Sequence, residues 1–228
     1  MGSFATLPDR LGSAYVALPS GGPGPGVLVL HAWWGLNPTF TAACDRLAGA
    51  GFVAVAPDLF GDRVVTTTPA ETEARSDAAP VAPIHARAAA ALALLDRHPL
   101  RLAGPIGVVG FSFGAYFALS LSQSHPEIGA VVTFYGTAGG DFSGASADYL
   151  GHYVPGDEWE PDEVVKALES KLAGAGRRVT FHSYPGTSHW FFEPDRPEFD
   201  AAAAALAWDR TIAFLEAHLQ PAAAEGRG

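Results

Sequence analysis

The sequence predicts an α/β fold, in which a mostly parallel central sheet carries helices on both faces, formed by a single domain over residues 1–228. Short apolar runs of strand length alternate along the chain with segments of ten or more residues that have helical spacing, which is the pattern of parallel strands joined by crossover helices. The length suits one such domain, because single α/β domains commonly reach about 200–250 residues. The hydrophobic content of 48% is enough for a packed core without disulfide or metal support.

The first half of the chain shows the alternation clearly. An apolar run at 27–31 precedes a helical segment at 38–50, where Pro38 occupies the first turn, a position that needs no N–H partner. A second run at 52–56 is closed by Pro57. The elements expected next are a helix over 84–98 that ends before Pro99, a β-branched strand over 106–109, a helix over 115–124 and a strand over 130–134.

The second half continues the same pattern. We expect a strand over 149–154, a helix over 163–176 that ends at a glycine, a strand over 179–183 and a long amphipathic helix over 197–219. Two irregular stretches interrupt the alternation. Residues 61–83 are too long for a tight connection and are expected to form either a partly helical cap or a mobile surface loop, and residues 221–228 a frayed tail.

Charge and cysteine content exclude several classes of function. The formal net charge is −10, and the 14 Lys and Arg residues are scattered, so the basic patch that nucleic acids and anionic membranes require is missing. No run of 18 apolar residues and no secretion signal is visible, which predicts a cytoplasmic protein without a membrane partner. The single cysteine, Cys44, can form no intrachain disulfide and is expected to pack in the core. We expect no metal or organic cofactor, and the sequence makes no prediction of oligomeric state.

A Gly-Phe-Ser-Phe-Gly motif at 110–114 follows the strand at 106–109 and precedes a helix. This context is typical of a nucleophile elbow, in which a sharp strand-to-helix turn exposes the serine hydroxyl and the flanking glycines leave room for the turn. The motif therefore makes Ser112 a candidate nucleophile. The alternative interpretation is a glycine-rich turn whose serine only caps the helix.

A serine nucleophile needs a base to accept its proton and an acid to orient that base, and in sheets of this kind the chain order is Ser, acid, His. His189 lies late in the chain in a loop after the strand at 179–183, which favours it as the base. Asp157 follows the strand at 149–154 and is the favoured acid. The spacing leaves open the histidines His125 and His152 and the acids Asp141 and Glu158, whereas His182 lies within a strand and is expected to pack there.

Hydrolysis also requires donors for the oxyanion. The backbone N–H of Phe113, directly after the candidate nucleophile, is expected to be one donor, and that of Trp33, in the loop after the first parallel strand, the other. Adjacent tryptophans cannot both face the core of an alternating backbone, so we expect a substrate pocket lined by Trp34, Trp159 and Trp190. The alternative is that these aromatic residues only pack.

These motifs resemble the dienelactone hydrolase family of α/β-hydrolases, over about residues 27–219. The resemblance is carried by the sequences His-Ala-Trp-Trp-Gly-Leu-Asn at 31–37, Ala-Pro-Asp-Leu-Phe-Gly at 56–61, Gly-Phe-Ser-Phe-Gly at 110–114, Gly-Asp-Glu-Trp-Glu-Pro at 156–161 and Tyr-Pro-Gly-Thr-Ser-His-Trp-Phe at 184–191. It implies an α/β-hydrolase fold, and it selects Asp157 over Glu158 as the acid and His189 as the base.

The chain also departs from the family pattern. Founding members of the family carry a cysteine at the position of Ser112 and a thiol-activating glutamate at the position of Ala32, and here both are replaced. A serine assisted by a histidine base needs no such partner, so the paired change is chemically consistent. Founding members also hold the carboxylate of dienelactone with arginines, one of them at the position of Glu193, although Arg196 is close by. A carboxylate at that position is expected to repel an anionic lactone.

The sequence therefore predicts a serine carboxylic-ester hydrolase that cleaves small, mostly neutral esters or lactones through an acyl-enzyme intermediate. A scaffold of the same fold that binds a small apolar ligand without catalysis is one alternative, since one fold hosts many functions. An acyltransferase or peptidase that uses the same three residues is another.

Overall fold

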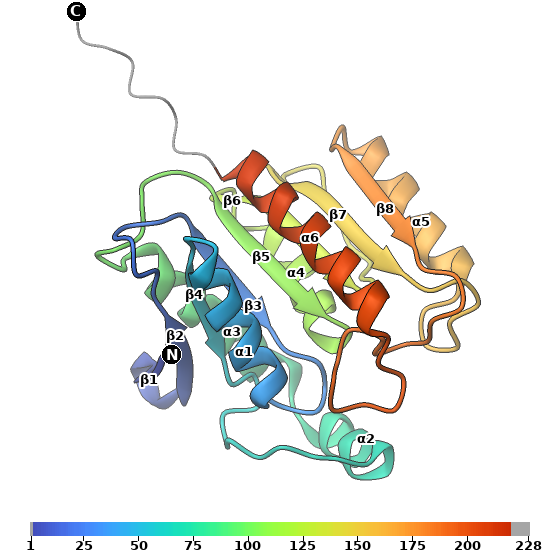
Figure 1. Cartoon of the computed structure of the whole chain (residues 1–228), viewed down its shortest axis with the longest axis horizontal. Coiled ribbons are helices and arrows are strands. Elements are labelled where there is room, and N and C mark those ends of the chain that lie inside the picture. Colours follow the sequence, from blue (N-terminus) through green and yellow to red (C-terminus); the bar gives the residue numbers. More distant parts are fainter. Residues whose placement is uncertain (1, 220–228) are drawn as a thin grey trace, which may run out of the picture.

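A single eight-stranded sheet forms the centre of the molecule in the computed structural model, which describes residues 2–219. The strand order is β1-β2-β4-β3-β5-β6-β7-β8 (Figure 1). β1 and β2 pair antiparallel at one edge and β2 joins β4 antiparallel, while all other pairings are parallel, which confirms the mostly parallel sheet. The strands are β1 (Ser3–Thr6), β2 (Ser13–Ala17), β3 (Gly26–Leu30), β4 (Val53–Pro57), β5 (Ile106–Phe111), β6 (Ile128–Phe134), β7 (Asp148–Tyr153) and β8 (Val179–Ser183).

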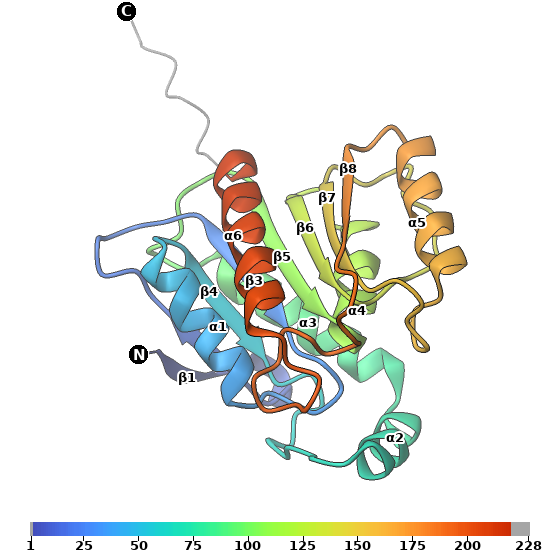
Figure 2. The ribbon, with the colours of Figure 1, turned by 45° about the vertical axis from the view of Figure 1, so that its right-hand side comes forward.

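Helices cover both faces of this sheet. The α-helices are α1 (Pro38–Gly49), α2 (Pro69–Ala78), α3 (Val81–Asp96), α4 (Phe113–Ser122), α5 (Asp162–Gly174) and α6 (Ala201–His218). α1 and α6 lie on one face, and α3, α4 and α5 on the other (Figures 1 and 2). Alternate residues of β3 accordingly point into two separate cores, Val27 and Val29 toward α1 and α6, Leu28 and Leu30 toward the opposite helices.

Several element boundaries differ from the sequence prediction. β1 and β2 were absent from it, because β1 is largely exposed and β2 is defined by its pairing with β4. α6 begins at Ala201 instead of residue 197, because the Asp200 carboxylate accepts hydrogen bonds from the N–H groups of Ala202 and Ala203 at 3.0 and 2.9 Å and so caps the helix. The predicted tail at 221–228 lies outside the described residues.

Residues 61–83 contain α2 and the first turn of α3, which corresponds to the partly helical alternative. Figures 1 and 2 show α2 beyond the edge of the sheet at which the parallel strands end. The segment is tied to the body of the protein because the Thr66 N–H donates to the Trp34 carbonyl at 3.0 Å and Arg196 Nη1 donates to the Thr67 carbonyl at 3.1 Å. Among residues 2–219 no single helix has both the length and the apolar character needed to cross a bilayer, and the sharply bent pair α2 and α3 meets those limits only jointly.

Candidate active site

Ser112 occupies a sharp turn between β5 and α4. Its φ of 47° and ψ of −112° are backbone angles that a side-chain-bearing residue holds only when its surroundings enforce them. The flanking glycines permit the turn: a Cβ on Gly110 would lie 2.6 Å from Ala115 Cα, and one on Gly114 would lie 2.6 Å from the His31 carbonyl oxygen. The Ser112 side chain makes no capping hydrogen bond to α4, so the helix-cap alternative is wrong.

His189 and Asp157 reach Ser112 from the loops that follow β8 and β7. His189 Nε2 lies 2.9 Å from Ser112 Oγ, and His189 Nδ1 lies 2.7 Å from Asp157 Oδ2. Because a carboxylate only accepts hydrogen bonds, the proton of the neutral imidazole is on Nδ1, and Nε2 is free to accept the serine proton. Asp157 Oδ1 also accepts from the Trp159 N–H at 2.9 Å, which fixes the carboxylate in its loop. Three loops distant in sequence thus form one chain of hydrogen bonds.

The alternative histidines and acids lie elsewhere. His125 pairs with Glu127 at 2.9 Å near the protein surface, and His152 is buried, with its two ring nitrogens against the hydroxyls of Tyr184 and Thr211. Within the described residues the Ser112 hydroxyl has no hydrogen bond to any of the other candidates, namely His125, His152, His182, Asp141 and Glu158.

The two predicted oxyanion donors are the backbone N–H groups of Phe113 and Trp33. Phe113 is the first residue of α4, where a backbone N–H has no partner inside the helix, and Trp33 lies in the loop after β3. Within residues 2–219 neither N–H donates to a protein acceptor. The Phe113 ring stacks on Phe60 with centroids 5.3 Å apart, so an aromatic pair lies beside the serine turn. The assignment of both N–H groups as oxyanion donors stays a prediction.

The tryptophans near the site differ in exposure. Trp34 is only 1% exposed, packed 5.3 Å from Trp190 and covered by the Arg196 guanidinium at 4.2 Å. Its predicted place in the wall of a substrate pocket is therefore wrong, because the second residue of the tryptophan pair turns into the core. Trp159 is 51% exposed, and its ring lies 5.1 Å from that of Trp33, the half-buried member of the pair.

Sequence reasoning missed Tyr135, whose ring packs against His189 with centroids 4.8 Å apart. Its position directly after the apolar strand at 130–134 was the available signal, since ligands gather beyond the ends of parallel strands. The Tyr135 hydroxyl donates to Glu193 Oε1 at 2.8 Å. Glu193 is 0% exposed, and burial raises its pKa to about 8. The sequence prediction has this carboxylate meet the substrate, whereas the structure encloses it beneath Tyr135.

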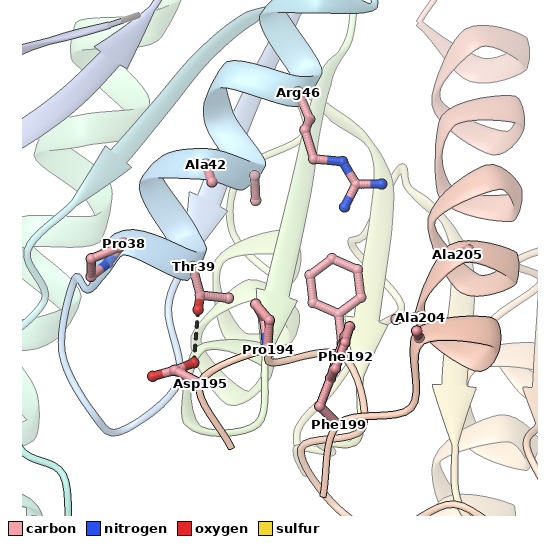
Figure 3. A pocket seen from close by; sticks show the side chains of 12 residues that line it. Pro38, Thr39, Ala42, Arg46, Phe192, Pro194, Asp195, Phe199, Ala204 and Ala205 are labelled. Atoms are coloured by element: carbon pink, nitrogen blue, oxygen red, sulfur yellow. Dashed lines mark hydrogen bonds between the residues drawn. The ribbon is translucent and has the colours of Figure 1, made fainter. Parts of the chain in front are cut away.

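Two of the cavities in residues 2–219 are lined in part by the segment 189–192. The first, here called the His189 cavity, has a volume of about 410 Å³, and its wall includes His189, Asp157, Trp159 and Trp190. The second, of about 540 Å³, lies between α1 and α6 above Phe192 (Figure 3). None of Ser112, His189 and Asp157 lines the second cavity. His189 and Asp157 line the His189 cavity, whereas Ser112, Phe113 and Trp33 do not.

Metal and thiol chemistry have no visible site in the described part of the chain. Within residues 2–219 no group of three His, Cys, Asp or Glu side chains is arranged to hold a metal ion. Cys44 is buried in α1, as predicted, and burial raises the pKa of its thiol far above the ordinary value. A thiol in this environment stays protonated and unreactive.

The fold and this arrangement of serine, histidine and aspartate define an α/β-hydrolase. The dienelactone hydrolase family matches residues 13–219, and the chain belongs to that family of hydrolases. A protein of Azospirillum brasilense, provisionally named a carboxymethylenebutenolidase, is 30% identical over 231 residues, covering 91% of this chain and 94% of its own length. Protein usf of Aquifex pyrophilus is 28% identical over 215 residues, covering 90% and 93%.

Solved structures confirm the fold. A dienelactone hydrolase-like promiscuous phosphotriesterase from metagenomic libraries has a TM-score of 0.84 at 24% identity, covering 96% of this chain and 99% of its own. A thermophilic esterase of Thermogutta terrifontis has a TM-score of 0.72 at 18% identity, covering 100% and 95%. At these identities the likeness establishes the α/β-hydrolase fold, as the sequence resemblance implied.

Proposed function

We propose that the protein is a serine hydrolase that cleaves carboxylic esters or lactones through an acyl-enzyme intermediate. The observation that carries this proposal is the chain of hydrogen bonds from Ser112 Oγ through His189 to Asp157, at 2.9 and 2.7 Å, built on a strained turn. Strain of this kind persists where function requires it, and membership of a hydrolase family supports the same assignment.

The reaction follows from this geometry. Ser112 Oγ attacks the ester carbonyl carbon while its proton passes to His189 Nε2, and the N–H groups of Trp33 and Phe113 hold the oxygen that becomes negative. Collapse of the tetrahedral intermediate breaks the bond to the alcohol oxygen, which takes the proton from His189. Water then attacks the acyl group by the same steps and restores Ser112. Asp157 keeps the proton on Nδ1 and stabilises the imidazolium that forms.

We propose that the substrates are small and mostly neutral in their acyl portion. The founding arginine position of the family is occupied by Glu193, which is enclosed and cannot clamp a carboxylate. Phe60 and Phe113 stack beside the serine turn and provide an apolar surface there. Both features favour short uncharged acyl groups over the anionic lactone for which the family is named.

Hydrolysis of p-nitrophenyl acetate and butyrate tests the assignment. Ser112→Ala and His189→Ala should each lower kcat by about 10³-fold or more, because the nucleophile and its base act as a unit. Ser124→Ala and His125→Ala are matched controls, since neither side chain contacts the site, and they should retain wild-type activity. Unchanged turnover in Ser112→Ala would refute the mechanism. A fluorophosphonate that fails to label Ser112 in folded protein would favour a non-catalytic scaffold.

A further inference from the structure

His31 is a buried histidine that the reaction described above does not use. It directly follows β3, is 0% exposed and begins the loop that carries Trp33. Both of its ring nitrogens are bonded to backbone groups: Nε2 accepts from the Leu59 N–H at 3.0 Å, and Nδ1 lies 2.6 Å from the Ala32 carbonyl oxygen. The side chain therefore joins the loop after β3 to the loop after β4.

These hydrogen bonds determine where the imidazole of His31 carries its proton. Because the Leu59 N–H donates to Nε2, that nitrogen has no proton, and the neutral ring has its proton on Nδ1. Burial is the largest cause that lowers the pKa of His31 to about 4, although the hydrogen bond to Ala32 and the charge of Asp58 act in the opposite direction. The ring is therefore neutral at pH 7, and its Nδ1–H donates to the Ala32 carbonyl.

The Ala32 carbonyl and the Trp33 N–H belong to the same peptide unit. In a trans peptide these two groups lie in one plane and point in opposite directions, and no peptide bond in the described residues is cis. A donor that holds the Ala32 oxygen therefore also fixes the direction of the Trp33 N–H, the predicted oxyanion donor. The Gly35 N–H reaches the same oxygen at 3.3 Å, so His31 makes the shorter of its two hydrogen bonds.

This peptide unit follows a segment that packs against the serine turn. β3 and β5 are neighbours in the sheet, so the loop after β3 and the turn after β5 leave it side by side. A Cβ on Gly114, in the first turn of α4, would lie 2.6 Å from the His31 carbonyl oxygen, which shows how closely the two segments approach. The N–H groups of Trp33 and Phe113 therefore belong to two chain segments that are in contact.

We infer that His31 is a positioning residue, which holds the Ala32 carbonyl and thereby orients the Trp33 N–H toward the oxyanion. The inference rests on the proposed ester hydrolysis, because an oxyanion donor acts only when it points to the place where negative charge develops. Removal of one such donor typically lowers kcat about 10²- to 10³-fold. A donor that remains but is free to turn should therefore cost part of that, about 10- to 100-fold.

His31→Leu and His31→Asn are a matched pair that tests the inference. The two new side chains are similar in size and both remove the acceptor for the Leu59 N–H, but the asparagine amide places a donor near the position of Nδ1. For p-nitrophenyl acetate we expect kcat to fall about 10- to 100-fold in His31→Leu, with KM changed less than about 3-fold. His31→Asn should have a kcat within about 3-fold of the wild type. Equal kcat in the two variants would overturn the inference.

A thionoester separates an effect on the oxyanion from a general loosening of the fold. p-Nitrophenyl thionoacetate has sulfur in place of the carbonyl oxygen, and sulfur accepts hydrogen bonds only weakly. The ratio of kcat/KM for the ester to that for the thionoester should fall about 10-fold in His31→Leu, whereas loosening would lower both values and keep the ratio. His152→Leu is the control, since His152 is equally buried and bonded through both ring nitrogens to Tyr184 and Thr211, and it should keep the wild-type ratio. An unchanged ratio in His31→Leu would refute the role at the oxyanion.

Nitrogen NMR of the histidine rings tests the hydrogen bonds without any substitution. In the folded wild-type protein at pH 7, His31 should carry its proton on Nδ1, and a proton on Nε2 or on both nitrogens would overturn the inference even if the His31 variants did not fold. Ester hydrolysis that persists in Ser112→Ala would instead refute the proposed function. Ser112-dependent hydrolysis with an unchanged kcat in His31→Leu would refute only the role of His31.

Discussion

Replacing Glu193 with glutamine should stabilise the protein above neutral pH. The Glu193 carboxyl is fully buried. One oxygen accepts a hydrogen bond from the Tyr135 hydroxyl, and the other has no partner among residues 2–219. Desolvation is the largest cause that raises its pKa from 4.5 to about 8, and the negative charges of Asp195 and Glu198 act in the same direction. The Tyr135 hydrogen bond and Arg196 oppose the rise. Glutamine keeps the shape and the acceptor oxygen without the titrating group.

The magnitude follows from proton linkage. Below pH 4.5 the carboxyl carries its proton in both the folded and the unfolded chain and imposes no penalty. Between 4.5 and about 8 the unfolded chain releases the proton while the folded protein keeps it, so the free energy of unfolding falls by about 1.36 kcal/mol per pH unit. From pH 4.5 to about 8 the total loss of unfolding free energy has an upper bound of about 5 kcal/mol. Above about pH 8 the loss no longer changes with pH. Allowing for relaxation around the charge, we expect a gain of about 2–4 kcal/mol for Glu193→Gln near pH 9.

Urea unfolding, followed by tryptophan fluorescence and circular dichroism at pH 5, 7 and 9, measures the effect. The wild type and Glu193→Gln should have similar free energies of unfolding near pH 5 and diverge progressively to pH 9, with equal dependence on urea concentration. Glu73→Gln, which removes an exposed carboxylate from α2, is the matched control and should follow the wild type at every pH.

The reasoning is refuted if Glu193→Gln is less stable than the wild type near pH 9, or if the difference between them does not grow with pH. Either result would mean that the ionised carboxylate is stabilised in the folded protein by an interaction that glutamine cannot make. Ester hydrolysis at pH 7 serves as a check on Tyr135, because glutamine still accepts its hydroxyl and should keep its ring against His189.

Three further predictions follow from the site and the core. Asp157→Asn should lower kcat by about 10³–10⁴-fold, because an amide no longer holds the proton on His189 Nδ1. The midpoint of urea unfolding should change little. A near-normal kcat would exclude Asp157 as the orienting acid. Gly114→Ala should destabilise the fold by several kcal/mol or prevent folding, because its Cβ would overlap the carbonyl oxygens of Leu30, the last residue of β3, and of His31. Gly174→Ala at the end of α5 meets no atom within 4 Å and should cost nothing, and thermal unfolding distinguishes the two variants. Cys44 should react with a thiol reagent only when urea unfolds the protein, so rapid labelling of the native state would contradict its burial.

Sequence patterns predicted the structure correctly where a residue type is compatible with only one local backbone conformation. The glycines around Ser112 predicted the serine turn, since only glycine fits so close to the neighbouring backbone. The loop at 184–189 placed His189 after a strand, where parallel sheets gather their functional side chains. The long helices were found because apolar residues at helical spacing must face a core. The ends of the helices were predicted less accurately. A capping residue such as Asp200 can start a helix several residues away from the point that apolar spacing and helix propensity indicate.

Sequence patterns gave wrong predictions where a side chain could point either into the core or toward the substrate. The sequence does not show which of the adjacent Trp33 and Trp34 faces the core. The path of the loop in the folded protein turns Trp34 into the core. Glu193 follows His189 closely and was expected to meet substrate, yet the chain folds it beneath Tyr135. Both errors concern burial, which depends on contacts made by residues far away along the chain.

The sequence by itself determined the alternation of strands and helices, the serine turn and the family, because each of these is encoded in local spacing and in residues that only one backbone conformation accommodates. The tertiary structure decided which of several histidines and acids meet Ser112, which tryptophans face a cavity, and the environment of Glu193. Those features arise where loops from separate strands converge at one edge of the sheet, and the distances and burial that control their chemistry do not exist until the chain has packed.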